Sequence, residues 1–189
     1  MPKVIGIAGA LRRGSYNAAL LRAASELAPA GLLIEAASIR DIPLYDGDVE
    51  AGKGIPDSVS ALKDRIAAAD GLLLVTPEYN NSLPGVFKNA IDWLTRPPKD
   101  IARVFRGKPV ALMGATPGPG GTGLSQAAWL SVLRTLGTVP WFGSRVQVSN
   151  AARVFDAEGR IIDEAVRASV EKHLLGFAEF LARFTTKGT

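Results

Sequence analysis

Residues 72–75 read Leu-Leu-Leu-Val, and Thr76-Pro77 follows them directly. Four consecutive apolar residues that end at a proline are typical of a β-strand buried on both faces, as in a parallel sheet covered by helices. Residues 58–69 before this run and residues 86–94 after it carry apolar side chains at helical spacing. This helix–strand–helix pattern predicts an α/β protein.

The same alternation continues toward both ends of the chain. We expect further strands at residues 4–8, 32–36, 110–113 and 144–148. We expect further helices from a cap at Asn17 to the Gly31 region, at 124–136 and at 164–184. Residues 40–57 read as a surface loop. The prediction is a doubly wound, three-layer α/β sandwich with a five-stranded parallel sheet, formed as one domain over residues 1–185, with a frayed tail at 186–189.

The composition excludes several kinds of chemistry. The 189 residues include no Cys and one His, His173, which we expect to be a packed helix residue. Disulfides, thiol nucleophiles, iron–sulfur clusters and the usual zinc sites are therefore excluded, and so is a Ser-His-Asp hydrolase with a His near a strand end. Any redox chemistry has to be carried by a bound cofactor.

The charge and the N-terminus limit the partners and the location. Lys and Arg exceed Asp and Glu by 22 to 18, a net charge of +4, which suits anionic ligands but is too mild to predict nucleic-acid binding. The apolar run at residues 4–8 is too short for a membrane span or an export signal. We expect a cytoplasmic protein that binds neither nucleic acid nor membrane.

Unusual residues follow three of the predicted strands, at the edge where doubly wound sheets bind ligands. Residues 9–17 read Gly-Ala-Leu-Arg-Arg-Gly-Ser-Tyr-Asn. A loop with glycine near both ends that leads into a helix favours a phosphate monoester, bound by backbone N–H groups, hydroxyls and arginine. An ordinary strand–helix turn with solvated arginines is the alternative. The G-x-G-x-x-G spacing of dinucleotide-binding folds is missing.

The other two strand exits are less specific by themselves. Residues 76–85 form a loop bracketed by prolines that fits either the edge of a flat polar-rimmed ring, with Tyr79 against it, or a plain connection with Pro84 in the first helical turn. Residues 114–123 hold five Gly and two Pro, so this loop either lets a ligand approach the backbone or simply moves.

Residues 47–54 nearly match a P-loop but lack its final Ser or Thr and follow no strand, so we reject that reading, as well as a metal site at Asp41, Asp46 and Asp48.

Three segments, residues 9–17, 41–46 (Asp-Ile-Pro-Leu-Tyr-Asp) and 77–93 (Pro-Glu-Tyr-Asn-Asn-Ser-Leu-Pro-Gly-Val-Phe-Lys-Asn-Ala-Ile-Asp-Trp), resemble the NADPH-dependent FMN reductase family. The likeness extends over essentially the whole chain and is greatest to the bacterial quinone and chromate reductase branch. It implies a flavodoxin-like fold with strand order 2-1-3-4-5. It also implies an enzyme that passes a hydride from NADPH or NADH through bound FMN to an acceptor such as a quinone, free flavin, azo compound or chromate.

The resemblance also implies a set of cofactor-binding residues and no catalytic acid, base or metal. Residues 10–17 would hold the FMN phosphate, the next loop would line the isoalloxazine ring mainly through its backbone, and a small hydroxyl residue would lie near the flavin. The implied residues are Ala10, Leu11, Arg12, Ser15, Tyr16, Asn17, Pro77, Glu78, Tyr79, Asn80 and Thr116. Two departures stand out: Ala10 replaces the family's usual Ser, and Thr122-Gly123-Leu124 replaces a small residue followed by Arg.

Relatives of this kind usually have their active site at a subunit boundary, so we expect a homodimer or homotetramer. Phe87, Ile91, Trp93 and Leu94 are candidate contacts, with core packing as the alternative. Two other functions stay open, a flavodoxin-type electron carrier and a non-catalytic FMN-binding regulatory protein. The basic charge and the two arginines of the first loop speak against a flavodoxin, which is usually acidic.

Overall fold

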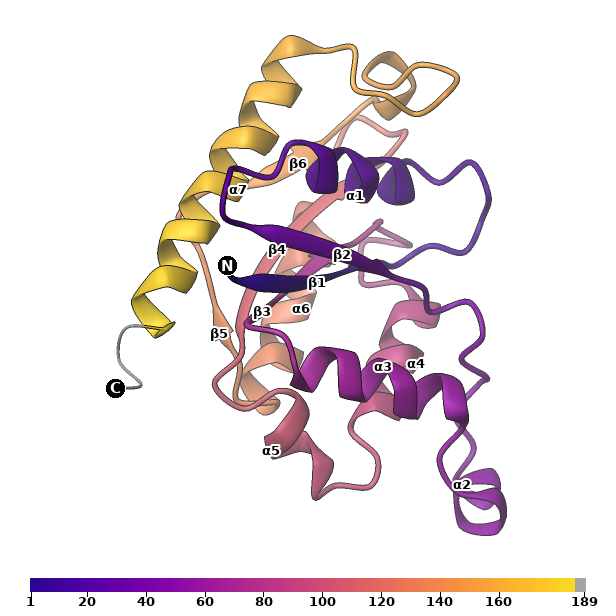
Figure 1. Ribbon diagram of the computed structural model, residues 1–189. Coiled ribbons are helices and arrows are strands. Elements are labelled where there is room, and N and C mark those ends of the chain that lie inside the picture. The colour runs from indigo at the N-terminus through magenta and orange to yellow at the C-terminus, as the bar shows by residue number, and fades with distance from the viewer. Residues whose placement is uncertain (186–189) are drawn as a thin grey trace.

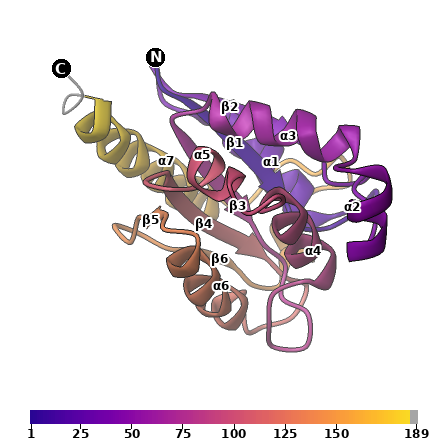
Figure 2. The same cartoon turned by 90° about the horizontal axis from the view of Figure 1, so that it is seen from below.

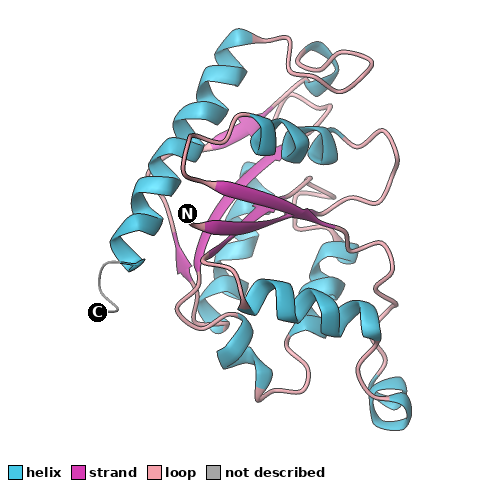
Figure 3. Ribbon diagram, viewed as in Figure 1, coloured by secondary structure: helices cyan, strands magenta, loops and turns pink. Residues whose placement is uncertain are grey.

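The computed structural model describes residues 1–185, and the predicted tail at residues 186–189 lies outside them. The strands are β1 (Lys3–Ala8), β2 (Leu33–Ala37), β3 (Gly71–Val75), β4 (Pro109–Ala115), β5 (Val139–Pro140) and β6 (Val146–Val148). The helices are α1 (Tyr16–Glu26), α2 (Gly47–Lys53), α3 (Asp57–Ala67), α4 (Gly85–Leu94), α5 (Asp100–Val104), α6 (Gly123–Thr135) and α7 (Glu164–Thr185), with a 3-10 turn at Ala151–Arg153. Figure 1 shows their order in space, and Figure 3 separates strands from helices by colour.

The strands form one parallel sheet in the order β2-β1-β3-β4-β5, which confirms the predicted topology. The central strand β3 pairs with both neighbours along its length, so that Leu73 lies opposite Gly6 on one side and Ala111 on the other. The chain places β2 on one side of β1 and then crosses to the other side of β1, where β3, β4 and β5 follow in order. The carboxyl ends of β1, β3 and β4 therefore lie together at the edge of the sheet where such folds bind ligands.

The fifth position in the sheet is occupied by two short segments instead of one strand. β5 pairs with the start of β4 through Val139 and Pro140, and β6 pairs with its end through residues 146–148. The sequence predicted the second segment and missed the first. Proline lacks the N–H that a strand donates, so Pro140 does not resemble a strand residue, yet it is tolerated at the edge of a sheet.

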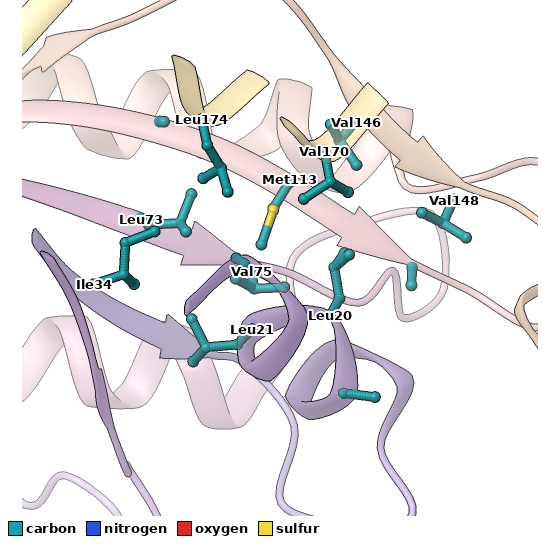
Figure 4. Close-up of a cluster of buried hydrophobic side chains, with 14 of the residues drawn as sticks. Leu20, Leu21, Ile34, Leu73, Val75, Met113, Val146, Val148, Val170 and Leu174 are labelled. Atoms are coloured by element: carbon teal, nitrogen blue, oxygen red, sulfur yellow. The ribbon is translucent and has the colours of Figure 1, made fainter. Parts of the chain in front are cut away.

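Helices cover both faces of the sheet, and each face has its own apolar core. Leu73 and Val75 belong to the core beneath α1 and α7, whereas Leu72 and Leu74 belong to the core beneath α3, α4, α5 and α6. Figure 4 shows the first core, and Figure 2 shows α3, α4 and α5 in front of the strands. The apolar run at residues 72–75 is thus explained by alternate burial on two sides.

Two helices and one cap differ from the sequence prediction. Helix α2 lies inside the expected loop at residues 40–57, and it has no buried residue, so no apolar periodicity marks it. The five-residue α5 is too short to show such a pattern. Helix α1 is capped by Ser15, whose Oγ accepts from the Ala18 N–H at 3.3 Å, and Asn17 lies within the helix instead of capping it. Among residues 1–185, no helix is both long enough and apolar enough to cross a membrane.

Candidate functional site

The first loop of the site joins β1 to α1 and presents unused hydrogen-bond donors. Its start is fixed because the Gly9 N–H donates to the Val75 carbonyl at 2.9 Å. Within the described chain, the backbone N–H groups of residues 11–16 have no hydrogen-bond partner. These donors precede or begin an 11-residue helix, whose N-terminus carries partial positive charge. Free donors next to a helix N-terminus form a binding place for an anion.

Two side chains of this loop have contacts of different kinds. The guanidinium of Arg12 lies over the Tyr16 ring, 5.2 Å from its centre. Asn17 is buried, and its amide pairs twice with the backbone of Ala115: its nitrogen donates to the carbonyl at 2.8 Å, and its oxygen accepts from the N–H at 2.9 Å. The Asn17 side chain therefore ties α1 to the end of β4, and its hydrogen-bonding capacity is largely used within the protein.

The second loop follows β3 and contains a tight turn. Tyr79 and Ser82 exchange two backbone hydrogen bonds of 3.0 Å, and both residues between them have positive φ, 50° at Asn80 and 61° at Asn81. This is a type I′ turn, and asparagine adopts that conformation more readily than other residues with a side chain. The N–H groups of Glu78, Asn80 and Asn81 have no partner in the described part of the chain. The turn therefore offers further backbone donors.

The third loop follows β4 and approaches the second loop closely. A Cβ built on Gly114 would lie 2.1 Å from the Thr76 carbonyl oxygen and 2.5 Å from Thr122 Oγ1, so only glycine fits at this position. Thr116 donates its N–H to Val148 at 2.9 Å, and its Oγ1 accepts from the Gly118 N–H at 3.4 Å. These contacts hold the ends of β3, β4 and β6 together.

The three loops surround a common cavity of about 600 Å³. It is lined by Ala10, Arg12, Ser15, Tyr16, Asn17, Pro77, Glu78, Tyr79, Ala115, Thr116 and Pro117. Nine of the eleven residues that the sequence implied thus lie around one space. Ala115, the last residue of β4, and Pro117, in the loop after it, are additional; both fall in the segment 114–123 that the sequence marked by its Gly and Pro content.

Two implied residues are outside the lining. Leu11 packs against the core beneath α3 and α4, and its carbonyl accepts a hydrogen bond from the Arg40 guanidinium. Asn80 occupies the tip of the turn. Arg40 was missed by the sequence analysis because it lies in a segment interpreted as surface loop. Its contact fixes the first loop from the side of β2.

His173 is remote from this cavity and has a packing role. It is fully buried on α7, its Nδ1 is 2.9 Å from Ser144 Oγ, and its ring meets Trp141 edge-on with centroids 4.9 Å apart. Burial lowers the pKa of His173 from 6.5 to about 4, so the imidazole is neutral near pH 7. No cluster of three or more metal-ligating side chains occurs among residues 1–185. The Asp46 side chain caps α2.

The donors and walls of the cavity fit FMN. A phosphate needs several N–H groups and a cation, which the first loop supplies through its free backbone donors, Ser15 and Arg12. A flat tricyclic ring needs apolar walls and donors at its edge, which Pro77, Tyr79 and the free N–H groups of the second loop supply. The volume lies in the range of cofactor sites.

Comparison with known proteins agrees with this geometry. The family model described as NADPH-dependent FMN reductase matches residues 2–153. An NAD(P)H-dependent FMN reductase of Pseudomonas aeruginosa is 46% identical over 172 residues, 91% of each chain, and a quinone reductase of Escherichia coli is 38% identical over 96% of each. Among solved structures, the flavoenzyme FerB of Paracoccus denitrificans, an NAD(P)H:(acceptor) oxidoreductase, superposes with a TM-score of 0.86 at 35% identity, covering 97% of this chain and 98% of its own.

Proposed function

We propose that the chain, which belongs to the NADPH-dependent FMN reductase family, is an FMN-dependent NAD(P)H oxidoreductase that uses quinone acceptors. We propose that its FMN site is the cavity between the loops after β1, β3 and β4. The observation that carries this assignment is the group of unpartnered N–H donors at residues 11–16, which belong to a loop that lines a cavity together with Pro77 and Tyr79.

The first loop holds the phosphate in this proposal. The backbone N–H groups of residues 11–16 and the Arg12 guanidinium supply hydrogen bonds and charge, and the N-terminus of α1 adds its dipole. Ala10 supplies no hydroxyl where the family usually has a serine. The number of free backbone donors compensates for that loss.

The second and third loops hold the ring. Pro77 and Tyr79 supply the wall, and the free N–H groups of Glu78 and Asn80 bond to polar atoms at its edge. Thr116, in the loop after β4, also lines the cavity. These contacts are made mainly by backbone, so that the identity of the ring-binding side chains matters less than the shape of the turn.

The protein's part in the reaction is positioning. When bound, FMN would supply the redox chemistry that couples oxidation of NAD(P)H to reduction of a quinone. The residues of the cavity orient the ring, exclude water from its inner face and stabilise charge at its edge through N–H donors. The Tyr79 side chain is 47% exposed, so the outer rim is open to NAD(P)H and to the acceptor in turn. Free flavin, azo compounds and chromate are further predicted acceptors.

We propose a homodimer or homotetramer in the cytoplasm. The contacts suggested by the sequence are wrong, because Phe87, Ile91, Trp93 and Leu94 are all buried within the core of one protomer. Apolar residues that remain exposed are better candidates. Leu130 on α6 and Phe142, which is 68% exposed, line one cavity between α6 and the connection from β5 to β6. A second copy that covers them would remove apolar surface from water.

The test is flavin analysis together with steady-state kinetics. Purified protein should be yellow, release FMN on denaturation and oxidise NADPH or NADH when a quinone is present. Yellow protein that does not oxidise either nicotinamide would instead indicate a flavodoxin-type carrier or a regulatory FMN-binding protein. Colourless protein that fails to take up added FMN would contradict the assignment of the cavity.

A further inference from the structure

A buried tryptophan connects two of the loops that line the cavity, the loop after β1 and the loop after β3. Trp129 on α6 is fully buried, and its ring meets Phe87 edge-on with centroids 4.8 Å apart. Phe87 in turn packs directly beneath Gly9, where a built Cβ would lie 2.1 Å from Phe87 Cδ1. Through Phe87, the indole therefore supports the start of the phosphate-binding loop.

The other end of the indole reaches the ring-binding loop through a hydrogen bond. Trp129 Nε1–H donates to Thr76 Oγ1 at 3.1 Å, and Thr76 is fully buried at the end of β3. Thr76 Oγ1 also donates to the carbonyl of Pro77 at 2.9 Å. Pro77 is the first residue of the second loop and lines the cavity.

The hydrogen bonds around Thr76 have only one consistent set of directions. An indole nitrogen can only donate, and the single Thr76 hydroxyl proton is directed to Pro77. The Ser125 hydroxyl, 2.9 Å away, must therefore donate to Thr76 Oγ1 as well. All three groups are buried and satisfied, so removing one leaves an unpaired polar atom in the core.

Ser125 completes the connection to the cavity wall. Its backbone N–H, in the first turn of α6, donates to Glu78 Oε2 at 3.0 Å. One oxygen of the Glu78 carboxylate is thus bound to the first turn of the helix. Two adjacent residues of the ring-binding loop, Pro77 and Glu78, are held by the same buried network.

We propose that Thr76 and Trp129 are positioning residues that set the geometry of the ring-binding loop relative to the phosphate-binding loop, and through it the redox potential of bound FMN. The proposal rests on the proposed function, because it assigns a role to these residues in the same site. Neither residue touches the cavity, so neither is a catalytic residue. Loosening their hydrogen bond leaves the turn at residues 79–82 less well held against the ring edge.

The test uses variants that remove one polar atom and keep the shape of the core. Thr76→Val deletes the hydroxyl, and Trp129→Phe deletes the indole N–H while keeping an aromatic ring against Phe87. Thr138→Val is the matched control, because Thr138 makes a similar bond, to the Leu133 carbonyl at 2.9 Å, at the far end of α6. Thr76→Ser, which keeps the hydroxyl, should restore the original behaviour.

The first measurement is hydrogen–deuterium exchange of the FMN-free protein. Thr76→Val should raise exchange about tenfold at the N–H groups of Tyr79 and Ser82, which are the hydrogen-bonded ones in the turn. Trp129→Phe should raise it by less, because it breaks only one of the three hydrogen bonds of Thr76 Oγ1, and the double variant should exchange no faster than Thr76→Val alone. The control should leave this segment unchanged. Unaltered exchange in both single variants, or an additive double variant, would overturn the proposal.

The second measurement is the midpoint potential of the FMN-loaded protein. Reduced FMN is more electron-rich and depends more on N–H donors, so Thr76→Val should weaken its binding about tenfold more than that of oxidised FMN. A tenfold difference corresponds to about 30 mV toward more negative potential for a two-electron couple, and Thr76→Ser should reverse it. An unshifted potential would reject the tuning role. Wild-type protein that binds no FMN would contradict the proposed function, while the exchange experiment would still test the loop.

Discussion

Neighbouring residues in the phosphate-binding loop have different surroundings. Both arginines are exposed, but Arg12 lines the cavity and lies over Tyr16, whereas Arg13 is outside the lining. Residue type alone does not separate the two arginines, because they are adjacent and both can reach an anion; only the family resemblance singled out Arg12. The fold separates them, since the direction in which the loop turns decides which side chain reaches the cavity.

Arg12→Ala should raise the dissociation constant of FMN about tenfold or more, because a charge-assisted hydrogen bond is worth roughly 1.5–3 kcal/mol. Titration of FMN-free protein by flavin fluorescence measures this directly. Arg13→Ala is the control and should change the constant less than threefold. Equal effects of the two substitutions would count against a specific role for Arg12.

His173 should make the stability depend on pH. Burial lowers its pKa from 6.5 to about 4 in the folded protein, whereas in the unfolded chain the pKa stays near its ordinary value. Between pH 6.5 and 4 the unfolded state therefore binds more protons, and the free energy of unfolding should fall as pH falls, by up to roughly 3 kcal/mol. Above pH 6.5 this contribution is fully present.

Urea denaturation at pH 7, 5.5 and 4.5 measures this dependence. His173→Phe should flatten the slope between these values, because it removes the group that titrates. Ser144→Ala, which removes the partner of His173 Nδ1 but keeps the imidazole, should retain the slope. A slope that is the same in His173→Phe and in the wild type would show that other groups dominate.

Helix α1 shows how an element presents the site. The helix begins after Ser15, whose side chain caps it, and Asn17 then bonds to β4, so the first turn of the helix is fixed from both sides. The Ser15 cap and the pairing of Asn17 with Ala115 therefore position the free N–H groups of the loop. The cap is therefore part of the site as well as of the helix.

Ser15→Ala should lower the free energy of unfolding by about 1 kcal/mol, the usual cost of losing an N-cap. Ser25→Ala in the same helix is the matched control. Its hydroxyl bonds to the Leu21 carbonyl at 3.2 Å within the helix, so its loss should cost less than half as much. Chemical denaturation of the FMN-free proteins compares the two, and equal losses would mean that Ser15 does not act as a cap.

At the scale of the whole molecule, the two layers of helices bury most of the apolar side chains against the sheet. Some large apolar side chains nevertheless remain exposed to solvent. Phe142 and Leu130 are exposed around one cavity next to α6. The residues that the sequence suggested for a subunit contact are inside the protomer, because an amphipathic helix looks the same whether its apolar face meets its own sheet or a partner.

Phe142→Asp should lower the assembly mass, from tetramer to dimer or from dimer to monomer, because it introduces a charge into an apolar contact. Light scattering after gel filtration measures the mass. Ile162→Asp is the control: Ile162 is 60% exposed but lines a different cavity, with Arg22 and Asp156. An unchanged mass in Phe142→Asp would place the subunit contact elsewhere.

The sequence by itself determined the class of fold and the loops of the site. Apolar runs such as residues 72–75 follow from burial on both faces of a strand, and residues at strand ends follow from the topology, so both can be read along the chain. The sequence left α2, α5 and β5 undetected, because a helix without buried residues and a two-residue strand with a proline have no periodic pattern.

Only the tertiary structure decided what each side chain contacts. Asn17 pairs with Ala115, 98 positions away, and Trp129 reaches Thr76, 53 positions away. Hydrogen-bond partners so distant in the chain depend on how the layers pack, and no local pattern records them. For that reason the chain order predicts where the cofactor-binding loops lie, whereas only the packed core shows which residues hold those loops in place.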